Sequence, residues 1–130
     1  NHKISFNMLH FILNYDSLFD CIDHLRGLGF HDNSLIAGPL YTPEQMNLLN
    51  LPSPMIEKVI KKIQSRLDDS PQGYLKNSYE NLLSYYQNTP WDKDIKAFVD
   101  DADIRDRRRG LECRKVFPKL FEELQKYGAV

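Results

Sequence analysis

The clearest alternation of apolar and polar positions lies between residues 53 and 68 and predicts an amphipathic helix. Ser53 can cap the free amides of its first turn, and Pro54 suits the first helical position. One face is apolar: Ile56, Val59, Ile60, Ile63 and Leu67. The charged positions between them are expected to face water: Glu57, Lys58, Lys61, Lys62 and Arg66. The helix should end near Asp68, before the turn residues 70–73.

The first 42 residues predict a strand, a helix and a second strand. Over residues 3–13, alternation gives way to an almost unbroken apolar run, which fits a strand buried on both faces, with a short helical piece as the alternative. Residues 16–28 have an apolar helical face, with Asp16 as a possible cap and Gly29 as a left-handed ending. Residues 33–36 suggest the second strand. This order is the βαβ pattern, which closes parallel and right-handed.

Helices account for the rest of the chain. One helical turn is expected within residues 44–49, with longer helices over residues 77–87 and 91–108 and from Pro118 onward. Trp91 is expected to open the second of these, and Gly110 to end it. The predicted fold class is therefore α+β and mainly helical. A short βαβ-like unit (1–42) precedes about four helices (43–130), in a single domain of 130 residues.

The composition of the chain argues against several classes of function. Hydrophobic residues make up 42% of the chain and charged residues 27%, which suits a globular domain, and the net charge of -1 gives no global field toward nucleic acid or membrane. No apolar run is long enough to span a bilayer, and no secretory signal opens the chain. Cys21 and Cys113 are expected to be reduced, apolar core residues of a cytoplasmic protein.

Catalytic and metal-binding motifs are missing from the sequence. It contains no glycine-rich phosphate loop and no nucleophile elbow. Asp20 and His24 have the i, i+4 spacing of a minimal metal site, which is more often a solvated pair. His10 lies in the apolar run, where a histidine usually hydrogen-bonds a neighbour. We expect no cofactor, no metal and no enzyme activity from this chain alone.

The most concentrated charge lies between residues 100 and 115. Asp103 and Arg107 have a favourable i, i+4 spacing for an ion pair on a helix. The basic residues of this segment form a candidate contact for phosphate or an acidic partner: Arg105, Arg107, Arg108, Arg109, Arg114 and Lys115. The neutral balance of the whole domain argues against nucleic acid as the ligand.

Several short segments, taken together, carry a family resemblance. They are Asn14-Tyr15, Gly29-Phe30, Gly38-Pro39 with Tyr41, Asn50-Leu51-Pro52, then Phe98, Asp103, Arg107 and Arg108, and finally Phe117-Pro118 with Leu120. In this order the chain resembles the C-terminal region of twitch-domain radical S-adenosylmethionine proteins of phage and marine bacterial type. The resemblance implies the last β-α-β portion of a partial barrel and a helical tail. The family's C-x3-C-x2-C run is absent, so no cluster ligand or catalytic residue carries over.

These observations lead to two main hypotheses about function, and a third, an enzyme with an unrecognised site around His10, ranks below them. In the first, the chain is a non-catalytic module that acts in protein–protein interaction or self-association, as a dimer or as the completing part of a parent protein with a missing N-terminal domain. In the second, it is a stand-alone protein that binds phosphate or nucleic acid through residues 105–115. A small sheet with open edges favours self-association.

Overall fold

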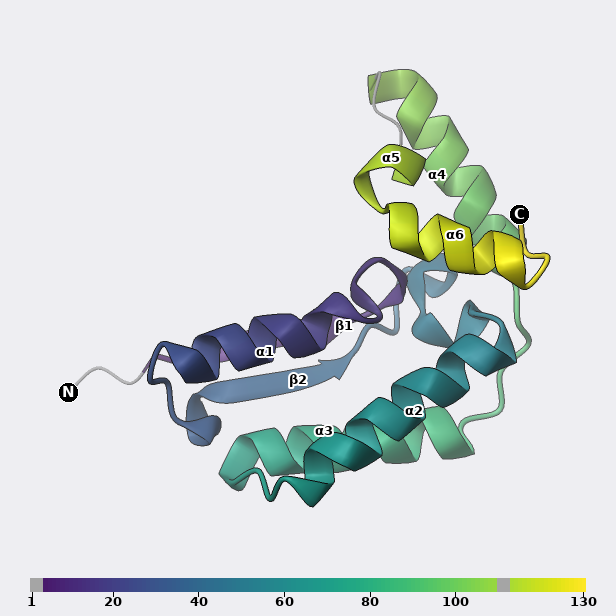
Figure 1. Cartoon of the computed structure of the whole chain (residues 1–130). Coiled ribbons are helices and arrows are strands. Elements are labelled where there is room, and N and C mark those ends of the chain that lie inside the picture. The colour runs from purple at the N-terminus through teal and green to yellow at the C-terminus, as the bar shows by residue number, and fades with distance from the viewer. Residues whose placement is uncertain (1–3, 110–112) are drawn as a thin grey trace.

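Two parallel strands and six α-helices make up the part of the chain that the computed structural model describes, residues 4–109 and 113–130 (Figure 1). The strands are β1 (Phe6–His10) and β2 (Leu35–Pro39). The helices are α1 (Ser17–Gly27), α2 (Ser53–Asp68), α3 (Gly73–Asn88), α4 (Ile95–Arg109), α5 (Cys113–Val116) and α6 (Pro118–Lys126). Four 3-10 turns connect them: η1 (Ile12–Asn14), η2 (Asp32–Ser34), η3 (Glu44–Met46) and η4 (Leu48–Asn50). The predicted fold class, α+β and mainly helical, is confirmed.

The sheet has the predicted parallel strand order, but β1 is buried on one face only. Phe6 lies opposite Leu35, and His10 lies opposite Pro39. His10 is fully buried, whereas Leu9 is 53% exposed, as expected for a pleated strand with one solvated face. The strand ends at His10 because Asn14 turns the chain: its Oδ1 accepts from the Phe11 amide, and its Nδ2 donates to the Leu9 carbonyl. The apolar run therefore continues as the short helical piece η1.

The first two long helices match their predicted ranges but not their predicted caps. Neither Asp16 nor Ser53 makes a side-chain capping hydrogen bond, and Ser53 is already the first residue of α2. Gly29 does adopt the left-handed conformation, with φ of 96°. Cys21 is exposed, so its expected place in the core was wrong, and Cys113 is only partly buried.

The starts of two helices differ from the sequence prediction. Helix α3 begins at Gly73 rather than residue 77, and α4 begins at Ile95 rather than Trp91. Trp91 stays outside the helix because its Nε1 donates to Asn50 Oδ1, 2.6 Å away. Asp94 caps α4 instead, accepting at Oδ1 from the Ala97 amide. The short α5 was not predicted, and the predicted stop at Gly110 lies outside the described residues.

Figure 1 shows α1 running along one side of the two strands, with α2 and α3 layered on the other side of β2 and α4, α5 and α6 gathered at one end. Phe19 of α1 stacks on Tyr79 of α3, with ring centroids 6.3 Å apart. Phe98 of α4 stacks on Phe121 of α6 at 6.2 Å. The buried cluster therefore includes residues from both the N-terminal unit and the helical part.

Candidate functional site

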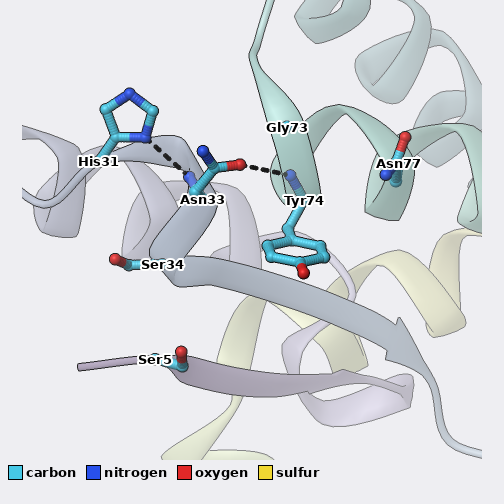
Figure 2. Close-up of a pocket in the computed structure, with 7 residues that line it drawn as sticks. All are labelled: Ser5, His31, Asn33, Ser34, Gly73, Tyr74 and Asn77. Atoms are coloured by element: carbon cyan, nitrogen blue, oxygen red, sulfur yellow. Dashed lines mark hydrogen bonds between the residues drawn. The ribbon is translucent and has the colours of Figure 1, made fainter. Parts of the chain in front are cut away.

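A polar cavity of about 760 Å³ lies where the two strands begin, beside the first turn of α3 (Figure 2). Its lining residues are Ser5, His31, Asn33, Ser34, Gly73, Tyr74 and Asn77. The ring Nδ1 of His31 accepts from the Asn33 amide at 3.1 Å, and Asn33 Oδ1 accepts from the Tyr74 amide at 3.2 Å. Asn33 thus satisfies an amide of the first turn of α3 that has no partner within the helix. The cavity offers hydroxyl and amide groups, and none of its lining side chains is a carboxylate.

His10, the last residue of β1, is fully buried, and its ring contacts Phe19 of α1 and Tyr86 of α3. Its Nε2 is 2.9 Å from the Tyr15 carbonyl oxygen, and its Nδ1 is 2.7 Å from the Tyr86 hydroxyl. A carbonyl can only accept, so Nε2 carries the proton and Nδ1 accepts from Tyr86. Burial lowers the pKa of His10 to about 4, against the opposing effect of the Tyr15 carbonyl. His10 is therefore a neutral, doubly hydrogen-bonded core residue, which agrees with the usual role of a buried histidine.

This burial predicts a pH dependence of stability. The His10 pKa is about 4 in the folded state and 6.5 in the unfolded state, so the unfolded chain binds the extra proton between these values. The free energy of unfolding should therefore fall by about 3 kcal/mol as the pH drops from 7 to 4. Urea denaturation at several pH values measures this slope. His10→Gln should flatten it. A slope that survives His10→Gln would contradict the assignment.

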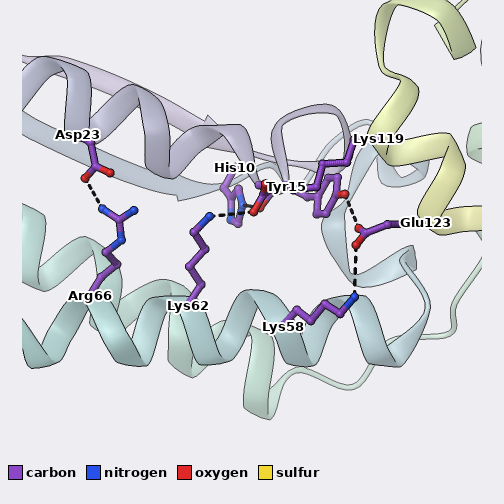
Figure 3. Close-up of polar contacts among 9 residues, drawn as sticks. His10, Tyr15, Asp23, Lys58, Lys62, Arg66, Lys119 and Glu123 are labelled. Carbon is purple, nitrogen blue, oxygen red and sulfur yellow. Dashed lines mark hydrogen bonds and ion pairs between the residues drawn. The ribbon is translucent and has the colours of Figure 1, made fainter.

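The polar face of α2 does not simply face water, as the sequence predicted. Lys58, Lys62 and Arg66 recur every fourth residue, and each contacts an acidic side chain on another element (Figure 3). Lys62 Nζ lies 2.9 Å from Asp16 Oδ1, and Lys58 Nζ lies 3.3 Å from Glu123 Oε1. Arg66 pairs with Asp23 of α1. This basic face therefore links α2 to both α1 and α6.

Two acidic residues complete the links to α6. The Tyr15 hydroxyl donates to Glu123 Oε2, and Asp16 pairs with both Lys62 and Lys119. Burial, reinforced by the Glu123 hydrogen bond, raises the pKa of the Tyr15 hydroxyl. Burial alone would raise the pKa of the Asp16 carboxyl, but hydrogen bonds from Lys119 and Lys62 outweigh it and hold this pKa below its usual range. These contacts hold α6 against the N-terminal unit, and the network that they form is structural.

The structure gathers only part of the predicted basic segment, residues 105–115, into a surface that could bind an anion. Arg105 Nε lies 3.1 Å from Asp101 Oδ2, and Arg114 lies 3.9 Å from Asp103, which replaces the predicted Asp103–Arg107 pairing. Arg107 and Arg108 are exposed on α4. The side chain of Arg109 lies outside the described residues, and Lys115 has a partner of its own. Two of the predicted cations therefore already contact carboxylates.

A second cavity, of about 210 Å³, lies between α4 and α5 and was missed by the sequence reasoning. Five of its lining residues come from one stripe of α4: Phe98, Asp101, Ala102, Arg105 and Asp106. The apolar members Phe98 and Ala102 belong to the stripe that the sequence predicts for this helix, but the spacing does not reveal that the charged members share a cavity with them.

Within residues 4–109 and 113–130, no cluster of three or more His, Cys, Asp or Glu side chains is placed to bind a metal ion. Asp20 and His24 are both exposed on α1. None of the described helices combines the length and the apolar character needed to cross a bilayer. The chain matches no protein-family model, no curated protein and no solved structure.

Proposed function

We propose that this chain is a non-catalytic interaction module, related to the C-terminal region of radical S-adenosylmethionine proteins, that pairs with a second copy of itself through β1. The observation that carries the proposal is an asymmetry between the two edges of the sheet. The Ala37 amide of β2 donates to Ser78 Oγ of α3 at 2.9 Å, in a buried hydrogen bond. The outer edge of β2 is thus met by a helix, whereas β1 pairs with no strand but β2 among the described residues.

Strand β1 also lacks the usual protection of an edge strand. Natural edges carry charged side chains, proline or bulges that prevent pairing with other chains. The sequence of β1 is Phe-Asn-Met-Leu-His, with no lysine, acid or proline. Leu9 is 53% exposed on it, and Ile4, just before it, is 56% exposed. An uncharged edge with exposed apolar side chains favours pairing over repulsion.

A two-fold axis at Asn7 would pair the open part of this edge, whereas the Leu9 carbonyl already accepts from Asn14 Nδ2. Two β1 strands would then run antiparallel, with Leu9 of one copy opposite Ser5 of the other, and would form a continuous four-stranded sheet. A cavity of about 400 Å³ lies on this side, lined by residues that include Asn7, Leu9 and Cys21. This cavity leaves space beside β1. No like charges would meet across the pair, because residues 4–9 are uncharged.

Light scattering across a dilution series tests the proposal. We expect the wild-type chain to be a dimer that dissociates on dilution, and Leu9→Lys to be a monomer, because a charge on the edge opposes pairing. Leu28→Lys is the matched control, since Leu28 is 62% exposed and follows α1, outside β1. It should remain a dimer.

Two outcomes would count against self-pairing. A wild-type monomer at every concentration would overturn it, and a wild-type monomer that binds a hydrophobic dye would instead favour a missing parent domain. A Leu9→Lys variant that dimerises as tightly as wild type would place the interface elsewhere.

The alternative function, phosphate or nucleic-acid binding by residues 105–115, is favoured only by the exposure of Arg107 and Arg108. Binding of this kind weakens steeply with salt. A labelled DNA duplex that binds at low salt, and is lost in the double variant Arg107→Gln/Arg108→Gln, would support it. Because Arg105 and Arg114 already contact carboxylates, self-association is the better-supported function.

A further inference from the structure

The cavity between α4 and α5 is separate from the β1 edge and has the features of a small-molecule site. Its apolar wall is formed by Leu13, Met46, Phe98, Ala102, Val116 and Phe117. Its volume of about 210 Å³ is below that of drug-sized pockets. An apolar cavity of about 150 Å³ is enough to hold benzene. This cavity therefore suits one aromatic ring with a short substituent.

The charged side chains of the cavity all come from α4. Asp101 and Asp106 supply two carboxylates, and Arg105 supplies one guanidinium, which leaves the lining with one net negative charge. Arg105 Nε lies 3.1 Å from Asp101 Oδ2, so these two charges largely offset each other. Asp106 Oδ2 accepts from the Cys113 amide at 2.8 Å, which fixes this carboxylate beside the cavity. Next to an apolar wall, the remaining charge interacts more strongly than it would in water.

We propose that this cavity binds a small apolar molecule with one positive charge, of the arylalkylamine class. The ring packs against Val116 and Phe117, the more exposed members of the apolar wall, and the ammonium group lies toward Asp106. A neutral molecule of the same shape keeps the apolar contacts and loses the charge attraction. An anion of the same shape is repelled.

Cys113 provides a direct readout because its thiol lies in the cavity wall. The rate of its alkylation by iodoacetamide can be measured by peptide mass spectrometry. Cys21, exposed on α1, is the internal control in the same molecule. Phenethylamine should slow alkylation of Cys113 about threefold at twice its dissociation constant, by occupancy alone. It should not change the rate at Cys21.

Ligands of similar shape but different charge, together with one variant, test the proposal. Protection of Cys113 should decrease from phenethylamine to 2-phenylethanol to 3-phenylpropionate. Asp106→Asn keeps an oxygen for the Cys113 amide and should weaken phenethylamine roughly fivefold, the effect of a solvent-accessible ion pair, while leaving 2-phenylethanol unchanged. Protection of neither cysteine, equal slowing of both, or equal protection by the amine and the acid would overturn the proposal. The ligand order in the wild-type protein decides it even if the variant does not fold.

Discussion

Replacing Ile63 with aspartate is expected to unfold the protein. Ile63 is fully buried on α2 and belongs to the main hydrophobic cluster. Removing its side chain alone costs about 2–5 kcal/mol, and a carboxylate placed there without a partner adds a desolvation penalty. Domains of this size are stable by only about 5–15 kcal/mol, so the combined loss removes most or all of the stability. Circular dichroism during thermal denaturation should show loss of the cooperative transition at neutral pH.

The neighbouring exposed position provides the control for this substitution. Gln64→Asp introduces the same residue into the same helix, on its solvated face. It should shift the free energy of unfolding by less than about 0.5 kcal/mol, as surface substitutions usually do. If Ile63→Asp melts like the wild-type chain, α2 does not bury its apolar stripe as the structure places it.

The elements that the sequence predicted well are those determined by local periodicity. The stripe of α2 predicted its range because Val59 and Ile63 face one packed surface. Similarly, Leu120, Phe121 and Leu124 of α6 are buried, as the pattern after Pro118 indicated. The strand order followed from the βαβ rule, which depends on chirality rather than on particular contacts.

The elements predicted poorly are those whose ends depend on distant side chains. Helix α3 starts early because Asp32 and Asn33 accept hydrogen bonds from the Gln72 and Tyr74 amides. Helix α4 starts late because Asn50 holds the preceding segment. A local sequence pattern cannot reveal a cap supplied from about 40 residues away.

The candidate sites show the same division between features set by the local sequence and features set by distant side chains. The basic residues after position 100 were visible by composition, and the i, i+4 spacing of Asp101 and Arg105 permits their ion pair, yet the sequence could not show that Arg114 of α5 would contact Asp103 of α4. Lys62 was placed on a solvated face because its partner, Asp16, comes from a distant part of the chain, just before α1. Charge pairing between elements is set by packing, which periodicity does not specify.

A smaller substitution with a large expected effect is Gly73→Ala, at the start of α3. Gly73 has φ of 49°, in the left-handed region, which costs other residues roughly 1–2 kcal/mol. An added Cβ would also lie 1.5 Å from Asn33 Oδ1, so the Asn33 side chain must move away. It then loses its hydrogen bond to the Tyr74 amide, a cap worth about 1 kcal/mol. Urea denaturation should show a total loss of about 2–3 kcal/mol.

A double-mutant cycle with Asn33→Ala separates the two causes. In that background the clash and the cap are already gone, so Gly73→Ala should cost only the backbone strain, about 1 kcal/mol less than in the wild-type chain. Gly27→Ala in α1 is the control, because a Cβ there meets nothing within 4 Å. It should be neutral or stabilising by up to about 1 kcal/mol. Equal costs of Gly73→Ala in both backgrounds would mean that the Asn33 side chain does not hold the start of α3.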